Sequence, residues 1–450
     1  MNERERSPWP TPTSLRRNDA RFIARQPWNR TDLLRALSVA FGSSGIPLRD
    51  LVDRLLRAVT APQRELIAIQ RVLEGSPFGV ERYRAFERRP NAVDRFDLPR
   101  ISSAPALHDW LGLPTEWASW FTDFRELERK RQPPKTKHYP RWWTARRWSI
   151  PRLIEAPKSQ LRRMQRKLLH ELLERVPFHP AAHGGVRGRS AVTHASLHTG
   201  RRVVAQFDLA DFFPSITFKR VSGFFVALGY PKPVAREVAA LTTTTTPAEL
   251  LDLQQLHSGG DRVVFHQLVM RLRERHLPQG APTSPALANH LTFMLDQRLS
   301  EAAKSMGLTY SRYVDDLAFS GDVPVSLERL ERIVESNVIS EGFTLRHRKS
   351  RLHTSSTRQR VTGLVVNVKP QPGRREFDRF RALLHQQAKT PTLPLAELEG
   401  KAEWFSTGRP ARRAKLRRLL DAINSAAASA AAGAAASTAA ESRAGADRAR

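Results

Sequence analysis

Three aspartates in two short motifs have the clearest potential for chemistry in this sequence. Asp315 and Asp316 stand side by side in YSRYVDDLAFSG (310–321), and Asp208 ends the apolar run that opens QFDLADFFPSI (206–216). Adjacent carboxylates repel one another, and desolvating them is unfavourable unless a cation compensates. Two divalent cations, Mg²⁺ or alternatively Mn²⁺, would remove this repulsion and clamp the attacking and leaving oxygens of a phosphoryl transfer. A solvated turn rich in aspartate is the alternative that YSRYVDDLAFSG alone leaves open.

A loop rich in glycine and proline supports the catalytic interpretation. HLPQGAPTSPALAN (276–289) runs into a predicted helix. It would place backbone N–H groups and the positive end of a helix dipole beside a nucleotide or a template backbone. An ordinary loop before a helix is the alternative. All three stretches, in this order and in a strongly basic chain, favour a site for phosphoryl transfer.

The charge of the chain points to a polyanionic partner. Its 450 residues contain 74 Lys and Arg against 44 Asp and Glu, a formal net charge of +30. Codon bias can put arginine in place of lysine but cannot create this excess, so we expect a nucleic acid partner. The absence of cysteine excludes disulfides and thiolate zinc sites and fits a cytoplasmic protein. We expect neither a secretory signal nor a membrane-spanning helix.

Hydrophobic periodicity predicts the elements that must position the aspartates. We predict a buried strand over 201–209, a helix over 283–307, a hairpin around the aspartate pair and a helix over 326–342. We also predict a basic hairpin over 138–157, an amphipathic helix over 159–176, a strand over 360–368 and basic helices over 374–424. This order indicates an α+β fold with an antiparallel sheet backed by helices.

The three motifs resemble the palm motifs of reverse transcriptases, over residues 138–420. QRVTGLVVN (359–367) resembles the Val-Thr-Gly element that follows the palm in bacterial retron reverse transcriptases. GGVRGRSAVTHASLH (184–198) resembles their Asn-Ala-x-x-His stretch, with Ser190 in place of the asparagine. The chain departs from the usual retron Tyr-Ala-Asp-Asp box by carrying Val314. The resemblance implies a right-hand-like polymerase with fingers, palm and helical thumb, and hydrophobic periodicity adds a helical N-terminal region outside the resemblance.

Composition and periodicity, together with the resemblance over 138–420, divide the chain into segments. These are a disordered basic N-terminus (1–30), a helical N-terminal region (31–137), reverse transcriptase fingers and palm (138–372), a helical thumb (373–424) and an Ala-rich disordered tail (425–450). The helical N-terminal region could bind RNA, bind an effector protein or brace the fingers, and its amphipathic pattern fits all three roles.

The resemblance assigns a role to each aspartate and to the loop beside them. Asp208 and Asp315 would ligate the two metal ions, and Asp316 would be a peripheral ligand or orient the site, with a structural turn acid as the alternative. The nucleotide-binding positions of the family fall on Asp211, Phe213, Gln279, Gly280, Arg152, Lys158 and Lys349. Contacts to primer, template or RNA fall on Tyr313, His194, Val361, Thr362 and Gly363.

Several of these positions have a distinct expected task. The backbone at Asp211 would meet the incoming triphosphate, and Phe213 would close on the sugar 2′ position and favour deoxynucleotides. Core packing is the alternative for Phe213. Arg152 and Lys158 would hold the triphosphate, with a solvated basic face as the alternative. Lys349 would donate a proton to leaving pyrophosphate.

Gln279 and Gly280 would line the nucleotide pocket, and Tyr313 would pack near the primer end. His194 would contact RNA or serve as a structural hydrogen bonder.

The implied function is that of an RNA-directed DNA polymerase of retron type. It would copy part of a partner noncoding RNA into RNA-linked single-stranded DNA from deoxynucleoside triphosphates, in anti-phage defence, with an effector protein as a further candidate partner. One alternative is a reverse transcriptase of another bacterial lineage, of group II intron or diversity-generating type. Another is a non-catalytic RNA-binding scaffold that keeps the palm fold, against which the three retained aspartates argue.

Overall fold

The structure is a computed structural model. It describes residues 23–25, 27–41, 46–60, 68–69, 72, 92–124, 138–146, 149–251 and 262–425. These residues fall into two compact units: the first within Met1–Arg189, Ala205–Phe319 and Val323–Arg351, the second within Ser190–Val204, Ser320–Asp322 and Leu352–Arg450. Among the described residues, no helix is long and apolar enough to cross a membrane. The predicted Ala-rich tail lies outside the described residues except for Ser425.

A four-stranded sheet carries the three aspartates at, or next to, the ends of its strands. Its order is β4-β5-β3-β6, built from β3 (Val203–Asp208), β4 (Thr309–Tyr313), β5 (Asp316–Gly321) and β6 (Arg351–Thr354). Most side chains of β3 and β5 are buried, so these two central strands lie in the hydrophobic core. The predicted strand ending at Asp208 and the predicted hairpin around the aspartate pair are both confirmed.

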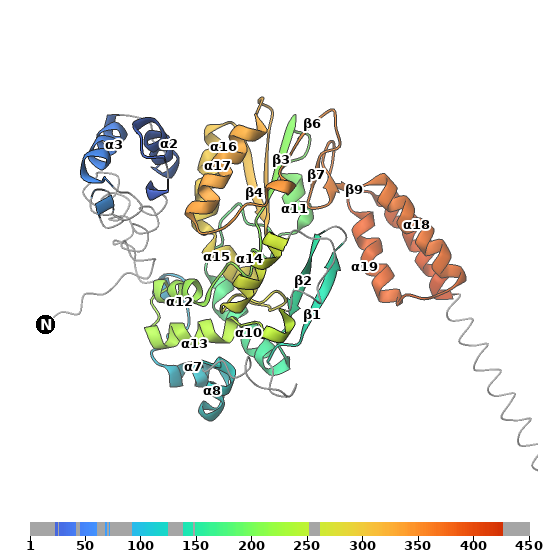
Figure 1. Cartoon of the computed structure of the whole chain (residues 1–450). Coiled ribbons are helices and arrows are strands. Elements are labelled where there is room, and N and C mark those ends of the chain that lie inside the picture. The colour runs from blue at the N-terminus through green and yellow to red at the C-terminus, as the bar shows by residue number, and fades with distance from the viewer. Residues whose placement is uncertain are drawn as a thin grey trace, which may run out of the picture. The chain divides into compact units, whose positions relative to one another are not determined.

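Helices α15 (Ser284–Leu291), α16 (Phe293–Ser305) and α17 (Leu327–Ser340) follow the loop and the hairpin, with α16 packed on β4 and α17 on α16 (Figure 1). The prediction of one unbroken helix over 283–307 is wrong. The chain leaves helical geometry at Thr292, where φ is −100° and ψ is 5°. The Thr292 hydroxyl donates to the Ala288 carbonyl at 2.8 Å, a local bond that competes with regular helix geometry.

The predicted hairpin and amphipathic helix near residue 150 are also present. β1 (Arg141–Arg146) pairs antiparallel with β2 (Ser149–Glu155), and α14 (Arg262–Arg273) packs on β2 through an apolar cluster that contains Leu153 and Phe265. α10 (Ser159–Glu171) buries Leu161 and the apolar residues aligned with it, and a 3-10 turn, η2 (Leu173–Arg175), follows. Its exposed face carries arginines, as the amphipathic pattern predicts.

Helix α13 (Lys232–Thr242), which packs on α12 (Phe218–Ala227), ends in a run of five threonines, Thr242–Thr246, and the 3-10 turn η3 (Ala248–Leu250) follows. The run is hydrogen-bonded to Arg141 and Glu155 of the β1–β2 hairpin. All five threonines are buried. The Thr242 and Thr243 hydroxyls donate to the carbonyls of Val238 and Ala239, respectively. Arg141 donates both to the Thr244 hydroxyl and to the Thr245 carbonyl. The Thr246 hydroxyl donates to the Glu155 carboxylate. Each threonine therefore has a buried hydrogen-bond partner, and Thr244 and Thr245 share Arg141.

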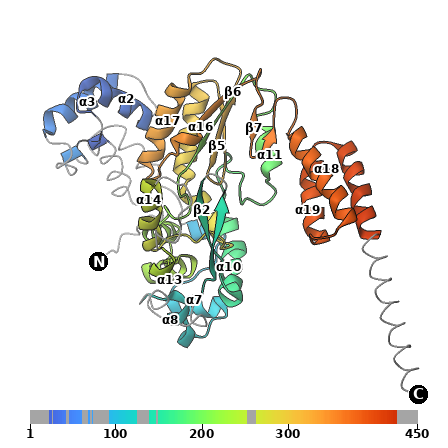
Figure 2. The same cartoon turned by 45° about the vertical axis from the view of Figure 1, so that its right-hand side comes forward.

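Short helices of the N-terminal region pack on α13. They are α6 (Ala92–Arg95), α7 (Ala104–Leu111) and α8 (Thr115–Thr122), the last two beside α13 (Figure 2). His108 of α7 meets Glu237 of α13 at 2.6 Å, and the Tyr230 hydroxyl donates to the Pro99 carbonyl at 2.9 Å. These contacts attach residues 92–124 to α13 and Tyr230, and the three roles that the sequence leaves open stay predictions.

A separate apolar cluster includes α2 (Arg30–Phe41) and α3 (Ile46–Ala58). Ile23 and Ala24 are buried in it, although the predicted disordered terminus extends to residue 30.

The second unit contains α11 (Ala191–Ser196), a three-stranded sheet and a helical bundle. The sheet consists of β7 (Arg360–Val361), β8 (Leu364–Val365) and β9 (Gln371–Pro372). The predicted single strand over 360–368 is wrong, because Thr362 and Gly363 have φ of 46° and 82° and form a tight turn between β7 and β8. α18 (Arg374–Lys389), α19 (Leu395–Ser406) and a helical segment over 410–425 share one apolar core, so the predicted basic helices are confirmed.

Candidate active site

Asp208 is a buried carboxylate surrounded by cationic side chains. Only 3% of its surface is exposed, and Lys349 Nζ donates to its Oδ2 at 2.6 Å. Lys349 comes from the 3-10 turn η4 (His347–Lys349), which lies close because the Arg346 N–H donates to the Asp208 carbonyl at 2.8 Å. Asp208 Oδ1 is buried and accepts no hydrogen bond from a described residue, although Arg346 Nη1 lies 3.4 Å away. Asp208 therefore keeps one oxygen available to a further cation.

The other two aspartates lie at the tight turn between β4 and β5. The Leu209 N–H donates to the Asp315 carbonyl at 3.0 Å, which fixes this turn beside the end of β3. Val314, the first residue of the turn, has φ of +58°. This left-handed conformation is unfavourable for a β-branched residue by about 1–3 kcal/mol and persists only where the surroundings enforce it. The backbone at the turn is therefore strained.

The carboxyls of the turn resist ionisation. Burial, and then the negative charge of Asp208, raise the pKa of Asp315. Burial, followed by the charges of Asp315 and Asp208, raises the pKa of Asp316 to about 7. Because the charge of Asp208 raises the pKa of both turn acids, and that of Asp315 raises the pKa of Asp316, these carboxylates are electrostatically coupled.

The donor set fits divalent cations that are held partly by substrate. Among the described residues, no three acidic or histidine side chains converge into a ready metal cage. Mg²⁺ in nucleotide-handling sites is usually held by one or two carboxylates together with water and substrate phosphates. Asp208 Oδ1, which accepts no hydrogen bond from a described residue, and the raised pKa values of Asp315 and Asp316 are the features expected of carboxylates that bind a cation.

Asp211 follows Asp208 by three positions in the sequence. It has φ of +47°, and its carboxylate is paired with Arg271 at 3.2 Å and with Arg346 at 3.5 Å. Burial raises its pKa, and the two arginines oppose that rise. The position therefore carries an acid held between two cations, next to the backbone that the sequence assigns to the triphosphate.

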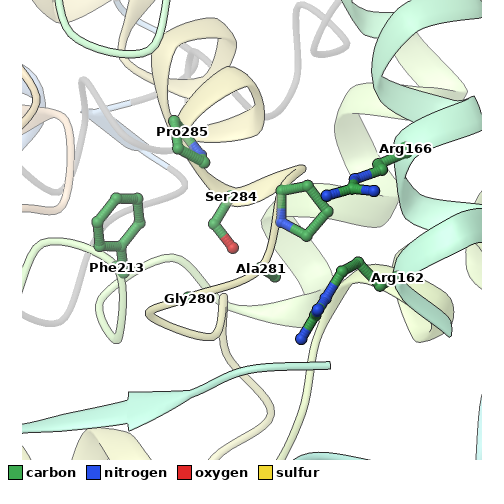
Figure 3. Close-up of a pocket in the computed structure, with 8 residues that line it drawn as sticks. Arg162, Arg166, Phe213, Gly280, Ala281, Ser284 and Pro285 are labelled. Atoms are coloured by element: carbon green, nitrogen blue, oxygen red, sulfur yellow. The ribbon is translucent and has the colours of Figure 1, made fainter. Parts of the chain in front are cut away.

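A cavity of about 400 Å³ adjoins the predicted nucleotide loop. Phe213 lies on one side of the loop segment Gly280–Pro285, and Arg162 and Arg166 of α10 reach it from the other (Figure 3). The sequence analysis names Phe213 and Gly280 but misses the two arginines. Their signal was a pair of cations four residues apart on the polar face of an amphipathic helix, which resembles any solvated face.

The predicted nucleotide loop is tied closely to the β1–β2 hairpin. The Glu155 N–H donates to the Gln279 carbonyl at 2.8 Å, and a Cβ added at Gly280 would lie 3.1 Å from the Glu155 carbonyl oxygen. The Glu155 carboxylate is buried and receives hydrogen bonds from Arg141 at 2.9 Å and from His276 at 2.9 Å. Burial opposes its ionisation, but these two partners outweigh that effect and lower its pKa to about 2. Glu155 therefore anchors both the loop and the hairpin.

The structure places the other named residues less centrally. Arg152 stands on β2 opposite Thr144, and its charge lowers the pKa of Asp315 and Asp316. Lys158 is exposed at the start of α10 and Tyr313 ends β4.

His194 and Val361 of the second unit have no exposed surface, so neither side chain can contact RNA in this conformation. The burial of His194 argues against the predicted RNA contact, and the alternative of a structural hydrogen bonder stays a prediction. Thr362 and Gly363 form the exposed β7–β8 turn, and the Thr362 hydroxyl donates to the Ala191 carbonyl at 3.1 Å.

Comparison with known proteins decides the family. Residues 147–369 match the model described as reverse transcriptase (RNA-dependent DNA polymerase). A retron Mx162 reverse transcriptase of Myxococcus xanthus is 33% identical over 457 residues, covering 95% of this chain and 83% of the relative. The chain belongs to the retron reverse transcriptases.

Two further relatives agree with this assignment. A retron Mx65 reverse transcriptase of Myxococcus xanthus is 40% identical over 288 residues, covering 63% of this chain and 64% of the relative. A retron Ec86 reverse transcriptase of Escherichia coli is 30% identical over 235 residues, covering 52% of this chain and 64% of the relative. The predicted limit of the resemblance at residue 138 is too narrow, because the Mx162 match extends well into the N-terminal region of this retron reverse transcriptase.

Proposed function

We propose that this chain copies part of a partner noncoding RNA into RNA-linked single-stranded DNA by two-metal nucleotidyl transfer. The observation that carries the proposal is the group of Asp208, Asp315 and Asp316, in which burial and the neighbouring carboxylates raise the pKa of both Asp315 and Asp316. We assign β1–β2 and α10 to the fingers, the sheet of β3 to β5 to the palm, and α18 and α19 to the thumb. In residue terms, fingers and palm span 138–372 and the thumb spans 373–424.

Asp208 and Asp315 would hold two divalent cations, with Asp316 as a peripheral ligand. When bound, such ions neutralise the charge that develops on the attacking hydroxyl and on the leaving pyrophosphate. The residues of the chain supply the other functions. Asp208 and Asp315 fix the place of reaction, and Lys349 holds a proton on Nζ, 2.6 Å from Asp208, where it can be given to pyrophosphate.

Side chains around the cavity would bind and select the nucleotide. Arg162 and Arg166 present guanidinium groups that suit phosphate oxygens. Arg152 and Lys158 of the same region would add positive charge. Phe213 faces the loop from the opposite side, where its ring would exclude a ribose 2′-hydroxyl and so favour deoxynucleoside triphosphates. Gln279 and Gly280 would line the nucleotide pocket, and Tyr313 would support the primer end.

The test is to express the chain with its flanking DNA and to run total nucleic acid on a denaturing gel, with and without RNase. A discrete DNA species that shifts after RNase treatment is the expected product. The variant with Asp315→Asn and Asp316→Asn should yield no such species while RNA binding, and its steep decrease with salt, is kept. Unchanged DNA synthesis in that variant would exclude the metal assignment.

A role in anti-phage defence rests on the family resemblance. The expected outcome is that cells carrying the complete locus survive phage better than cells with the Asp315→Asn and Asp316→Asn variant. Equal survival would separate the polymerase from defence. The same survival assay, on deletions of neighbouring genes, would identify an effector partner.

A further inference from the structure

Arg312 is a charged side chain in the core, one residue before the Tyr-Val-Asp-Asp box. It has no exposed surface and heads the largest fully buried side chains of the described residues. Its Nε donates to Asp296 Oδ1 at 2.8 Å and its Nη2 donates to Asp296 Oδ2 at 2.6 Å. The Tyr310 hydroxyl also donates to Asp296 Oδ1 at 2.8 Å. The guanidinium is thus held in one orientation by a two-point pair with α16.

The remaining donor of this guanidinium reaches the turn that carries the aspartates. Arg312 Nη1 donates to the Val314 carbonyl at 2.9 Å and to Asn289 Oδ1 at 3.0 Å. Val314 is the residue held at φ of +58°. The hydrogen bond therefore acts on the carbonyl of the strained residue, directly before Asp315.

A second branch of the same hydrogen-bond network runs through Asn289 to Gly184, which packs against the turn. Asn289 Nδ2 donates to the Gly184 carbonyl at 2.8 Å. Gly184 packs so closely on the turn that an added Cβ would lie 2.7 Å from the Val314 nitrogen. The backbone of Arg312 fixes the same segment, since its carbonyl accepts from the His183 N–H and its N–H donates to the Ala181 carbonyl. Both branches converge on Val314.

A purely stabilising function does not explain this arrangement. Replacing a buried ion pair by apolar residues is often neutral or stabilising, so such a pair is weak evidence for stability. Buried polar networks are better explained by the single geometry that they specify. Here that geometry is a left-handed residue which a β-branched side chain does not adopt without external support.

We propose that Arg312, oriented by Asp296 and Asn289, is a positioning residue that keeps Val314 left-handed and thereby sets the place of the Asp315 carboxylate. The inference rests on the proposed polymerase function. It assigns a task to residues that touch neither nucleotide nor metal. Its consequence is that the need for Arg312 should depend on which residue stands at position 314.

The test compares Arg312→Lys with Tyr310→Phe in the full chain. Arg312→Lys keeps the positive charge but loses the guanidinium group that hydrogen-bonds both the Asp296 carboxylate and the Val314 carbonyl. Tyr310→Phe removes a hydrogen bond to the same carboxylate without touching the turn, so it is the matched control. The readouts are single-turnover DNA synthesis on a supplied primer and RNA template at saturating deoxynucleotide, and the thermal midpoint of unfolding.

We expect Arg312→Lys to slow synthesis by about 10- to 100-fold, the effect of misplacing a reacting group by around 1 Å. Tyr310→Phe should slow it by less than about threefold on the same reasoning, even where its thermal midpoint falls as far. Adding Val314→Gly should restore most of the rate lost in Arg312→Lys, because glycine adopts positive φ without strain.

Two results would overturn the proposal: equal rate losses in the two variants at equal thermal midpoints, or a failure of Val314→Gly to reduce the effect of Arg312→Lys. Where Arg312→Lys yields no folded protein, Asn289→Ala takes its place, with the same rescue expected. Synthesis by the unsubstituted chain keeps these failures apart from failure of the proposed function, which would show as no DNA synthesis at all.

Discussion

Replacing Gly184 by alanine tests the packing of the active-site turn with the smallest possible change. A Cβ at this position would lie 2.5 Å from Val314 Cγ2, 2.7 Å from the Val314 nitrogen and 3.2 Å from the Tyr313 carbonyl carbon. A side chain could rotate away, but the backbone nitrogen cannot move without the turn. The contact is about 0.7 Å short of the 3.4 Å at which ordinary contact begins, so the turn or the Gly184 segment must shift by a comparable distance.

The magnitude follows from that displacement. Overpacking of this kind costs about 1–3 kcal/mol in the free energy of unfolding. A shift approaching 1 Å at reacting groups can lower a rate by roughly 100-fold. We therefore expect Gly184→Ala to lower single-turnover DNA synthesis by one to two orders of magnitude. Adding Val314→Ala should recover only part of the loss, since it removes the Cγ2 overlap and leaves that with the nitrogen.

Gly223→Ala supplies the matched control. Gly223 lies inside α12, and an added Cβ there meets nothing within 4 Å. The same chemical change should raise the free energy of unfolding by about 0.5–1 kcal/mol and leave synthesis unchanged. Wild-type rate and thermal midpoint in Gly184→Ala would refute the packing argument, and so would an equal effect of the two alanines.

Three further predictions concern the cavity and the core. The double variant Arg162→Ala and Arg166→Ala should raise KM for deoxynucleotides by roughly 10- to 100-fold, which corresponds to the loss of one or two charge-assisted hydrogen bonds. Arg163→Ala, on the exposed face of α10, should leave KM unchanged. Equal KM values for the two variants in steady-state kinetics would show that Arg162 and Arg166 do not bind the nucleotide. Phe213→Ala should let ribonucleotides compete in a primer-extension assay, and unchanged discrimination would favour plain core packing. Burial lowers the pKa of His290 to about 4 from 6.5. Stability should therefore fall by up to about 3 kcal/mol as pH drops from 6.5 to 4, because the unfolded chain binds the extra proton. His290→Phe should flatten that slope in urea titrations at several pH values, and an unchanged slope would assign it to another group.

Local patterns predicted the parts of this fold that depend on local physics. A buried strand ending at Asp208, a hairpin around two aspartates, and a helix that ends at Ser340, shortly before Gly342 with φ of +78°, all have short-range causes. Predictions from hydrophobic periodicity failed where one or two residues change the backbone geometry. The Thr292 hydroxyl and the Thr362–Gly363 turn interrupt segments whose apolar pattern is continuous.

The candidate site was predictable only as far as its motifs extend. The three aspartates and the glycine loop carry their chemistry in their residue types. The partners that orient them do not: Arg312 looks like one more arginine in a chain of 74 basic residues, and only the tertiary fold brings Asp296 to it. Burial is equally invisible in a motif: the sequence leaves RNA contact and a structural hydrogen bond open for His194, and only the structure shows that the side chain has no exposed surface.

The five consecutive threonines of Thr242–Thr246 limit how the length of this tract can change when the gene mutates. Repeats of one residue are encoded by repeated or near-repeated triplets, which are prone to gain or lose a unit when a gene is copied. In most proteins such a tract lies in a solvated segment and tolerates a change of length. Here one inserted or deleted threonine would move the later hydroxyls and carbonyls out of step with Arg141 and Glu155 and leave buried polar groups unpaired. The tract should therefore vary in its codons but not in its length.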